Sequence, residues 1–274
     1  MKICFSSLAC PAWTLDQVVN IAASSGYDGI ELRFLEGEDS IWKLPAFQGT
    51  SLKTSIQKIS DRGLSVACVD TSCRFHSPDP QERAGWVDEG MRMAELASAL
   101  GAPGIRVFGD KIQPGADRAS TRHWIAEGVR QLAERTVPHG VGIWLETHGD
   151  FASSTETMAI LEESGRKEAG VVWDAANAFA DGKEQPLDGI HNFGNKLQHV
   201  HLKDLKCREG RWEPVLSGEG QFPMREIVAE LERQKYGRFV SFEWEKKWHP
   251  HLAEPEISIP HFAGWFRQIS QDQP

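Results

Sequence analysis

The sequence lacks the features that mark membrane proteins, disulfide-stabilised secreted proteins and nucleic-acid-binding proteins. No apolar run approaches the roughly 20 residues that cross a bilayer, and the apolar stretch before Pro11 is too short for a signal peptide. The five cysteines are odd in number and form no CxxC pair, which argues against a disulfide framework. The net charge is −9 and no segment concentrates lysine or arginine, so a basic face for nucleic acid is not expected. We therefore expect a cytoplasmic protein with no membrane and no nucleic-acid partner.

What is present fits a soluble globular protein. Of the 274 residues, 40% are hydrophobic and 25% are charged, which is ordinary for a packed domain. Only two tyrosines stand against ten tryptophans. Flat apolar rings suit the C–H faces of sugars, so some tryptophans could line a sugar pocket, whereas most should pack in the core or at its rim.

Short apolar runs alternate with longer stretches of helical periodicity. The runs are rich in Val, Ile, Phe or Trp and are bounded by glycine, proline or charged residues, as buried parallel strands are. Eight such runs are predicted as strands: Ile3–Ser7, Gly29–Arg33, Ser65–Asp70, Gly104–Phe108, Val141–Glu146, Gly170–Asp174, Gln198–Leu202 and Arg238–Glu243.

Eight strands, each followed by a helix or a long loop, predict an α/β fold, specifically a (β/α)8 TIM barrel. A doubly wound nucleotide-binding sheet would need a glycine-rich turn after the first strand, where this chain reads SSLACPAW. No Pro-, Gly- or Ser-rich linker interrupts the alternation. We expect one domain over residues 1–274.

Four consecutive predicted strands end in groups that can bind a metal. The ends are Glu146, Asp174, His201 and Glu243. The carboxyl ends of barrel strands point to the active-site mouth, so three anions should meet there and repel one another. A divalent cation would offset that repulsion. Each residue taken singly could instead be a helix cap or a salt-bridge partner.

The types of ligand atom limit which metal ions are expected. Three carboxylates and one imidazole, without a thiolate, favour one divalent ion, with Mn²⁺ first and Mg²⁺, Co²⁺ or Zn²⁺ as alternatives.

Several motifs along the whole chain resemble the xylose-isomerase-like TIM barrels, a family of sugar isomerases, ketose 3-epimerases, inosose dehydratases and endonuclease IV. The matching segments are GYDGIELR (26–33), LGAPGIRVFG (100–109), LETH (145–148), VVWDAANAF (171–179), HVHLKD (199–204), SGEGQF (217–222) and FEWE (242–245). The resemblance places the metal ligands at the same four residues. It implies carbohydrate metabolism, with a small sugar or polyol as substrate and a possible homo-oligomer.

The resemblance also implies a mechanism. A hydroxy-ketone would bind the metal, and the cation would stabilise an enediolate. Glu146 and Glu243 would be the catalytic residues of an isomerase or epimerase, one removing a proton and the other returning it. An inosose-type dehydratase would add the loss of a β-hydroxyl, with His148 or Lys203 as the acid.

Six further residues are candidates for substrate binding. His148 follows Glu146 by two and should point to the same side, while Glu31 and Arg106 could bind sugar hydroxyls or form internal salt bridges. Lys203 could bind substrate or pair with Asp204. The remaining two candidates, Asn177 and Arg208, lie where this chain departs from the family's pattern. Asn177 occupies the position of a histidine that is common in the family, and Arg208 lies one residue beyond the position of the arginine found in the 3-epimerases.

Two other functions compete with this one. An endonuclease IV-like repair enzyme needs three zinc ions and extra histidines, but Cys73, Gly109 and Asn177 stand near those places and the chain is acidic. A non-catalytic sugar-binding barrel would keep the fold without turnover. The complete ligand set argues against that reading.

Overall fold

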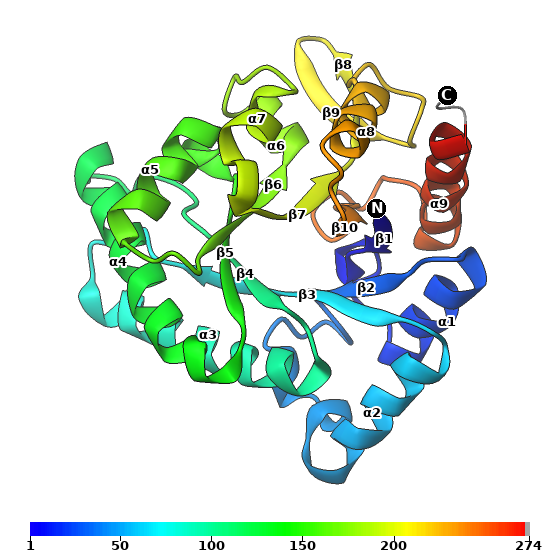
Figure 1. Ribbon diagram of the computed structural model, residues 1–274, viewed down its shortest axis with the longest axis horizontal. Helices are drawn as coiled ribbons and strands as arrows, with labels where there is room; N and C mark the ends of the chain where they lie inside the picture. The colour runs from blue at the N-terminus through cyan, green and yellow to red at the C-terminus, as the bar shows by residue number, and fades with distance from the viewer. Residues whose placement is uncertain (272–274) are drawn as a thin grey trace. The chain divides into compact units, whose positions relative to one another are not determined.

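A computed structural model describes residues 1–271 of the chain (Figure 1). Eight strands form one sheet: β1 (Lys2–Phe5), β2 (Gly29–Leu32), β3 (Ser65–Arg74), β4 (Gly104–Phe108), β5 (Gly142–Glu146), β6 (Gly170–Asp174), β7 (Leu197–Leu202) and β10 (Phe239–Phe242). Nine helices are described: α1 (Leu15–Ser25), α2 (Gly49–Asp61), α3 (Pro80–Leu100), α4 (Arg118–Thr136), α5 (Ser154–Ser164), α6 (Ala175–Ala180), α7 (Asp188–Phe193), α8 (Met224–Arg233) and α9 (Pro255–Gln271).

The sheet has the strand order of a barrel. Across it the strands run β1, β10, β7, β6, β5, β4, β3 and β2. The neighbours β1 and β10, β10 and β7, β3 and β4, β4 and β5, and β5 and β6 pair in parallel. A parallel bridge between Ser6 and Glu31 joins the two end strands. The predicted TIM barrel is therefore confirmed, with all eight predicted strands present.

The sequence did not predict a small hairpin that follows β7. Its strands β8 (Asp204–Arg208) and β9 (Arg211–Val215) pair antiparallel in a separate two-stranded sheet. Glu209 and Gly210 make the turn, with φ of 50° and 78°. Positive φ at both central residues is typical of a tight hairpin turn.

The residues group into two compact units, one of residues 1–67 and 200–274 and the other of residues 68–199. Both boundaries fall inside a strand, in β3 and in β7. In the first unit α1 packs with α2 and α9, and in the second α4 packs with α3 and α5. That the chain folds as one domain stays a prediction.

Local chemistry fixes where helices begin and end. Thr14 and Gln17 form a capping box at the start of α1, and Gly26 ends it in the left-handed conformation with φ of 75°. Asp79 caps α3, whose first residue is Pro80, the helical position that tolerates proline best.

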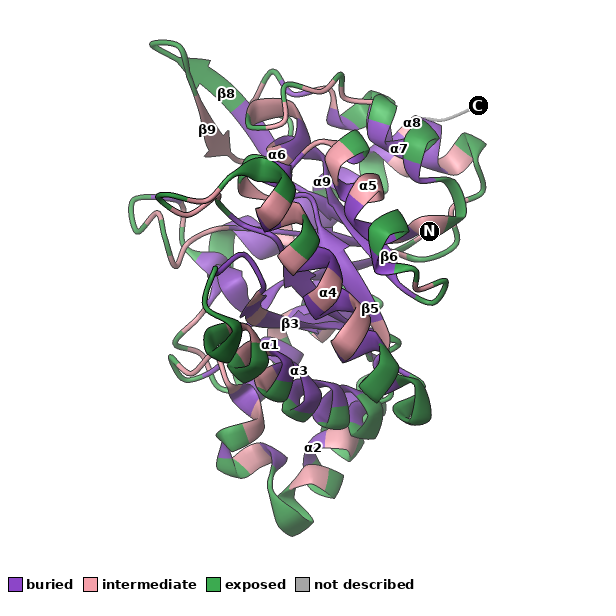
Figure 2. Cartoon of the chain, turned by 90° about the vertical axis from the view of Figure 1, so that its left-hand side faces the viewer, coloured by how far each residue is buried: buried purple, intermediate pink, exposed green. Residues whose placement is uncertain are grey.

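The core of the second unit is apolar and tightly packed. Cys68, Trp144 and Val172, from β3, β5 and β6, form one buried cluster. A Cβ added at Gly104 would lie 2.3 Å from the Trp144 ring, so the first residue of β4 has to be glycine. Figure 2 shows β6 buried along its length, whereas α3 and α4 each expose one side. No helix among residues 1–271 is long and apolar enough to cross a membrane.

Candidate metal centre

The four predicted ligands all lie at or next to the carboxyl end of a strand, and all are buried. Glu146 and Asp174 are the last residues of β5 and β6. His201 is the last residue but one of β7, and Glu243 directly follows β10. The side chains of Asp174 and His201 have no exposed surface.

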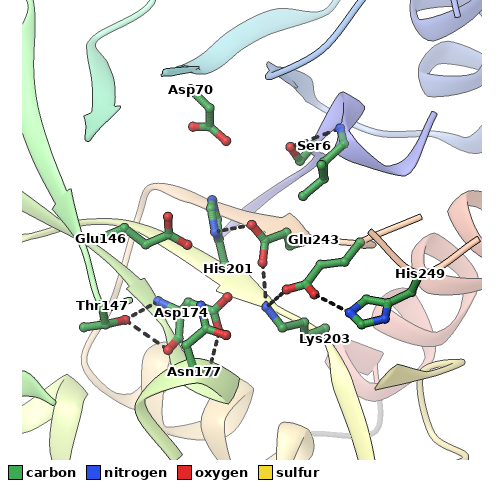
Figure 3. A network of polar contacts seen from close by, with 12 residues as sticks. Ser6, Asp70, Glu146, Thr147, Asp174, Asn177, His201, Lys203, Glu243 and His249 are labelled. Carbon is green, nitrogen blue, oxygen red and sulfur yellow. Dashed lines mark hydrogen bonds and ion pairs between the residues drawn. The ribbon is translucent and has the colours of Figure 1, made fainter. Parts of the chain in front are cut away.

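Asp174 is held by its backbone and by one carboxylate oxygen. Its N–H donates to Thr147 Oγ1 at 2.9 Å, and that hydroxyl donates to the Asp174 carbonyl at 3.0 Å (Figure 3). The Asn177 N–H donates to Asp174 Oδ1 at 2.8 Å, which makes Asp174 the N-cap of α6. Asn177, a predicted substrate residue, thus lies one helical turn from Asp174.

Glu146 is paired with a buried arginine. Arg106 Nη1 lies 3.1 Å from Glu146 Oε2, and its Nη2 lies 3.3 Å from Asp70 Oδ2. The sequence left open a sugar contact or an internal salt bridge for Arg106, and the structure has the salt bridge. Arg106 therefore fixes one oxygen of Glu146.

His148 packs at the same end of β5. Its ring stacks on Phe108 with the centroids 4.9 Å apart, and its Nδ1 lies 3.5 Å from Asp110 Oδ1. Burial lowers the pKa of His148, but the carboxylates of Asp110 and Glu146 raise it more, so that it lies above its usual value. Burial alone would raise the pKa of Asp110, yet His148 and Arg74 hold it well below its usual range. Asp110 and Arg74 were not predicted as site residues, because Asp110 lies two residues beyond β4 and Arg74 lies four residues beyond the predicted end of its strand at Asp70.

The imidazole of His201 lies between two carboxylates. Its Nε2 is 3.2 Å from Glu31 Oε2, and its Nδ1 is 3.1 Å from Glu243 Oε1. Glu31 has no exposed surface. The predicted substrate residue Glu31 thus contacts a candidate ligand directly.

Lys203 is a buried cation between two carboxylates. Its Nζ lies 2.6 Å from Glu243 Oε2 and 2.8 Å from Glu245 Oε1. Glu245 Oε2 in turn lies 3.3 Å from His249 Nε2 (Figure 3). Burial raises the pKa of Glu245, but the charge of Lys203 together with the hydrogen bonds from His249 and Lys203 holds it below its usual value. The hydrogen bond to Glu245 raises the pKa of His249.

The alternative pairing of Lys203 with Asp204 is wrong. The Asp204 carboxylate instead accepts the N–H groups of Leu205, Gly218 and Gly220 at 2.8 to 3.0 Å. Lys203 lies between β7 and β8 and Asp204 begins β8, and the two side chains have different partners. Asp204 holds the loop after the hairpin in place.

Arg208 lies at the exposed end of β8. Its Nε is 3.7 Å from Glu213 Oε2 across the hairpin. Its predicted contact with substrate stays a prediction.

A curated relative is an isomerase. The chain is 26% identical over 179 residues to the 2-oxo-tetronate isomerase of Pectobacterium atrosepticum. The match covers 61% of this chain and 65% of that protein, so it spans just under two thirds of the relative's length.

Three solved structures share the fold. An L-ribulose 3-epimerase has a TM-score of 0.82 at 17% identity, covering 98% of this chain and 94% of that one. A probable 3-DHS dehydratase, AsbF of Bacillus anthracis, has a TM-score of 0.81 at 18% identity, covering 97% and 99%. The IolI protein with a bound zinc atom has a TM-score of 0.80 at 18% identity, covering 99% of each chain. At these identities the likeness establishes the fold alone.

The family itself is established by a broader match. The family model described as xylose isomerase-like TIM barrel matches residues 19–269, nearly the whole chain. It includes every strand end discussed above except that of β1. The resemblance seen in the sequence motifs is therefore confirmed, and the chain belongs to the xylose isomerase-like TIM barrel family.

Proposed function

We propose that this protein is a divalent-metal-dependent isomerase of small hydroxy-ketones, and that Glu146, Asp174, His201 and Glu243 hold its metal ion. One observation carries the proposal. The four buried side chains stand at or next to the carboxyl ends of β5, β6, β7 and β10, which follow one another across the sheet. TIM-barrel enzymes place their active sites at this edge.

The donor set fits a divalent cation. The four residues are a combination that could hold a metal ion, each offering one ligand atom. Buried carboxylates are costly unless positive charge offsets them. Oxygen donors with one imidazole suit Mn²⁺ first, with Mg²⁺, Co²⁺ and Zn²⁺ as alternatives. The zinc atom in the IolI protein supports a divalent cation without selecting the metal.

The glutamates are arranged as proton carriers. When bound, the cation would supply Lewis-acid stabilisation of negative charge on the carbonyl and hydroxyl oxygens of the substrate. Glu146 and Glu243 exchange the proton on the carbon beside the carbonyl, one removing it and the other returning it. Arg106 and Lys203 each bind the Oε2 atom of one of these glutamates, which keeps the two carboxylates in fixed orientations.

The name of the curated relative suggests the first substrate to test. A 2-oxo-tetronate isomerase acts on a four-carbon 2-oxo sugar acid. Such a compound carries the carbonyl and neighbouring hydroxyl that the proposed chemistry needs. We infer that the substrate is a 2-oxo sugar acid, with a neutral ketose as the alternative. An epimerase would use the same groups and return the proton to the opposite face of one carbon.

The test is isotope exchange. The purified protein is incubated in D₂O with Mn²⁺ and a panel of 2-oxo-tetronate, neutral ketoses, keto-inositols and their phosphates. We expect deuterium at the carbon next to the carbonyl of one compound, together with an isomerised product. Glu146→Gln and Glu243→Gln should abolish exchange, while Glu226→Gln, an exposed glutamate of α8, should not. Failure of every compound to exchange with metal-loaded protein would overturn the proposal.

One observation favours dehydration as a second candidate. His148, held beside Asp110 and stacked on Phe108, stands two residues from Glu146 and could donate a proton to a departing hydroxyl. The same incubation distinguishes this outcome, because the substrate then loses one water and the product has a conjugated carbonyl that absorbs in the ultraviolet. A sugar-binding protein without turnover would instead bind a compound of the panel and exchange nothing.

A further inference from the structure

Two cationic side chains share one aromatic ring in the unit of residues 1–67 and 200–274. The Arg33 guanidinium carbon lies 4.3 Å from the centroid of the Phe34 ring, and Lys247 Nζ lies 5.0 Å from the same centroid. Trp248 packs edge-on against Phe34 with the centroids 6.0 Å apart. Lys247 Nζ is also 6.0 Å from the Trp248 ring. We call these four residues the cationic rim.

The cationic rim follows two strand ends that carry candidate ligands, or contacts of those ligands, in its unit. Arg33 follows Glu31, which contacts His201, by two residues. Lys247 follows Glu245, which contacts Lys203, by two residues. Both segments therefore continue outward from strand ends that carry the candidate site.

The backbone around the rim is fixed. The N–H groups of Arg33 and Phe34 both donate to Ser7 Oγ, at 2.8 and 3.2 Å. The Trp248 N–H donates to the Glu245 carbonyl at 2.9 Å. The backbone that carries the rings and charges is thus held by hydrogen bonds, which lowers the entropy lost when a ligand binds.

The charge of Lys247 is not neutralised inside the protein. No carboxylate among residues 1–271 lies within ion-pair distance of Lys247, whose ammonium group lies against the two rings. In a chain with a net charge of −9, the charge of Lys247 creates a local positive potential beside the low-dielectric surface of the two rings. Trp248 is 57% exposed, which leaves a flat apolar face beside that charge.

We propose that Arg33 and Lys247 bind an anionic group of the substrate, with Trp248 lying against its carbon chain. The anionic group is a carboxylate or a phosphate, since both are bound by paired arginine and lysine side chains. The inference rests on the proposed function for the identity of the ligand. It makes the cationic rim the part of the protein that selects acidic over neutral ketoses.

The test compares three four-carbon compounds: 2-oxo-tetronate, neutral erythrulose and erythrulose 4-phosphate. In Lys247→Gln we expect KM for the anionic substrate to rise about tenfold relative to KM for erythrulose, the effect of one lost charge-assisted hydrogen bond. A larger effect on the acid assigns the rim to a carboxylate, and a larger effect on the phosphate ester assigns it to a phosphate. Arg33→Lys keeps the charge but loses the planar guanidinium, and should give a smaller change of the same sign.

Lys2→Gln is the matched control. Lys2 Nζ also lies over a phenylalanine, 5.6 Å from the Phe239 centroid, but both residues begin their strands at the opposite edge of the sheet. This variant should leave all three KM values at the wild-type level. Equal effects of Lys247→Gln on acidic and neutral compounds, or none on either, would overturn the inference.

Calorimetric titration of the same three compounds separates this inference from the proposed function. If turnover does not depend on Lys247, the anion-binding role of the cationic rim is refuted and the proposed isomerase function is unaffected. If an anionic compound binds in a way that depends on Lys247 but is not turned over, the anion-binding role of the rim is supported and the proposed isomerase function is refuted. Absence of both binding and turnover overturns both.

Discussion

His201 and Glu31 form a fully buried pair in which imidazole Nε2 lies 3.2 Å from carboxylate Oε2. The opposite ring nitrogen, Nδ1, faces Glu243 at 3.1 Å. A carboxylate that accepts Nε2–H fixes the tautomer in which Nδ1 carries a lone pair. Metal-binding histidines commonly have such a partner. The pair therefore bears on the strength of the proposed metal site rather than on substrate alone.

Glu31→Gln should weaken metal binding. The amide replaces the anion beside Nε2, so the ring is less firmly held in the ligating tautomer. Loss of such partners costs roughly 10- to 100-fold in metal affinity, and we expect a decrease of that order for Mn²⁺ in calorimetric titration. Glu36→Gln, an exposed glutamate in the segment that follows β2, is the control. Equal Mn²⁺ affinity in both variants would show that Glu31 does not support the metal site.

Lys203→Met should destabilise the fold strongly. Lys203 is buried and neutralises Glu243 and Glu245 at 2.6 and 2.8 Å, so its removal leaves two carboxylates without their cation. Breaking a buried ion pair costs about 3–5 kcal/mol of unfolding free energy. Lys58→Met is the control, because the Lys58–Asp16 pair is about half exposed and should contribute about 0–1 kcal/mol. Urea denaturation of the metal-free proteins measures both changes in unfolding free energy. Similar losses in the two variants would refute the role of Lys203 as the buried cation that neutralises Glu243 and Glu245.

The strands and their ends were predictable because buried strands require runs of apolar residues, which can be seen in the sequence. Parallel strands covered on both faces are apolar nearly throughout, and β4 and β6 have the bounds that their runs predicted. A single charged residue directly after such a run stands out against it, as Asp174 does after Gly170–Trp173. The candidate ligands could therefore be read from local pattern alone.

The partners of those residues could not be predicted in the same way. Lys203 pairs with Glu243, 40 residues further along the chain, whereas its sequence neighbour Asp204 binds the backbone of another loop. Long-range pairs depend on how strand ends meet in space, and no local spacing encodes that. The hairpin of β8 and β9 was missed because its strands mix charged with apolar residues and are mostly exposed or half-exposed, without the apolar run that marks the barrel strands.

Asp110 should make stability fall on acidification. His148 and Arg74 hold the pKa of Asp110 below its usual range, and His76 Nδ1 lies 4.0 Å from the same carboxylate. A carboxyl group with a lowered folded-state pKa stabilises the protein above its unfolded pKa of about 3.9, and the contribution is lost as pH falls through the folded-state value.

Urea denaturation of wild type and Asp110→Asn between about pH 6 and pH 2 measures this effect. The difference in unfolding free energy between the two proteins should be largest above about pH 4 and shrink below it. Asp16→Asn, which removes an exposed carboxylate paired with Lys58, should show a much smaller difference at every pH. A difference for Asp110→Asn that is constant over the range would contradict the prediction.

Removal of the metal should lower thermal stability in a way that depends on Asp174. A ligand that binds only the folded state stabilises it by about 2.7 kcal/mol at 100 times its Kd, so the unfolding midpoint should fall with a chelator and recover with Mn²⁺. Asp174→Asn removes the charge but keeps a side-chain oxygen for the Asn177 N–H that it caps, since asparagine is a good N-cap. We expect this variant to fold and to lose the response to Mn²⁺.

Asp117→Asn is the matched variant, because Asp117 caps α4 through the Ser120 N–H at 2.8 Å and takes no part in the proposed site. Its midpoint should rise with Mn²⁺ as the wild-type midpoint does. Calorimetric scans with and without Mn²⁺ provide the measurement, and one cooperative transition would also support a single domain. A full Mn²⁺ response in Asp174→Asn would remove Asp174 from the metal site, because a neutral amide oxygen binds a divalent cation more weakly than a carboxylate does.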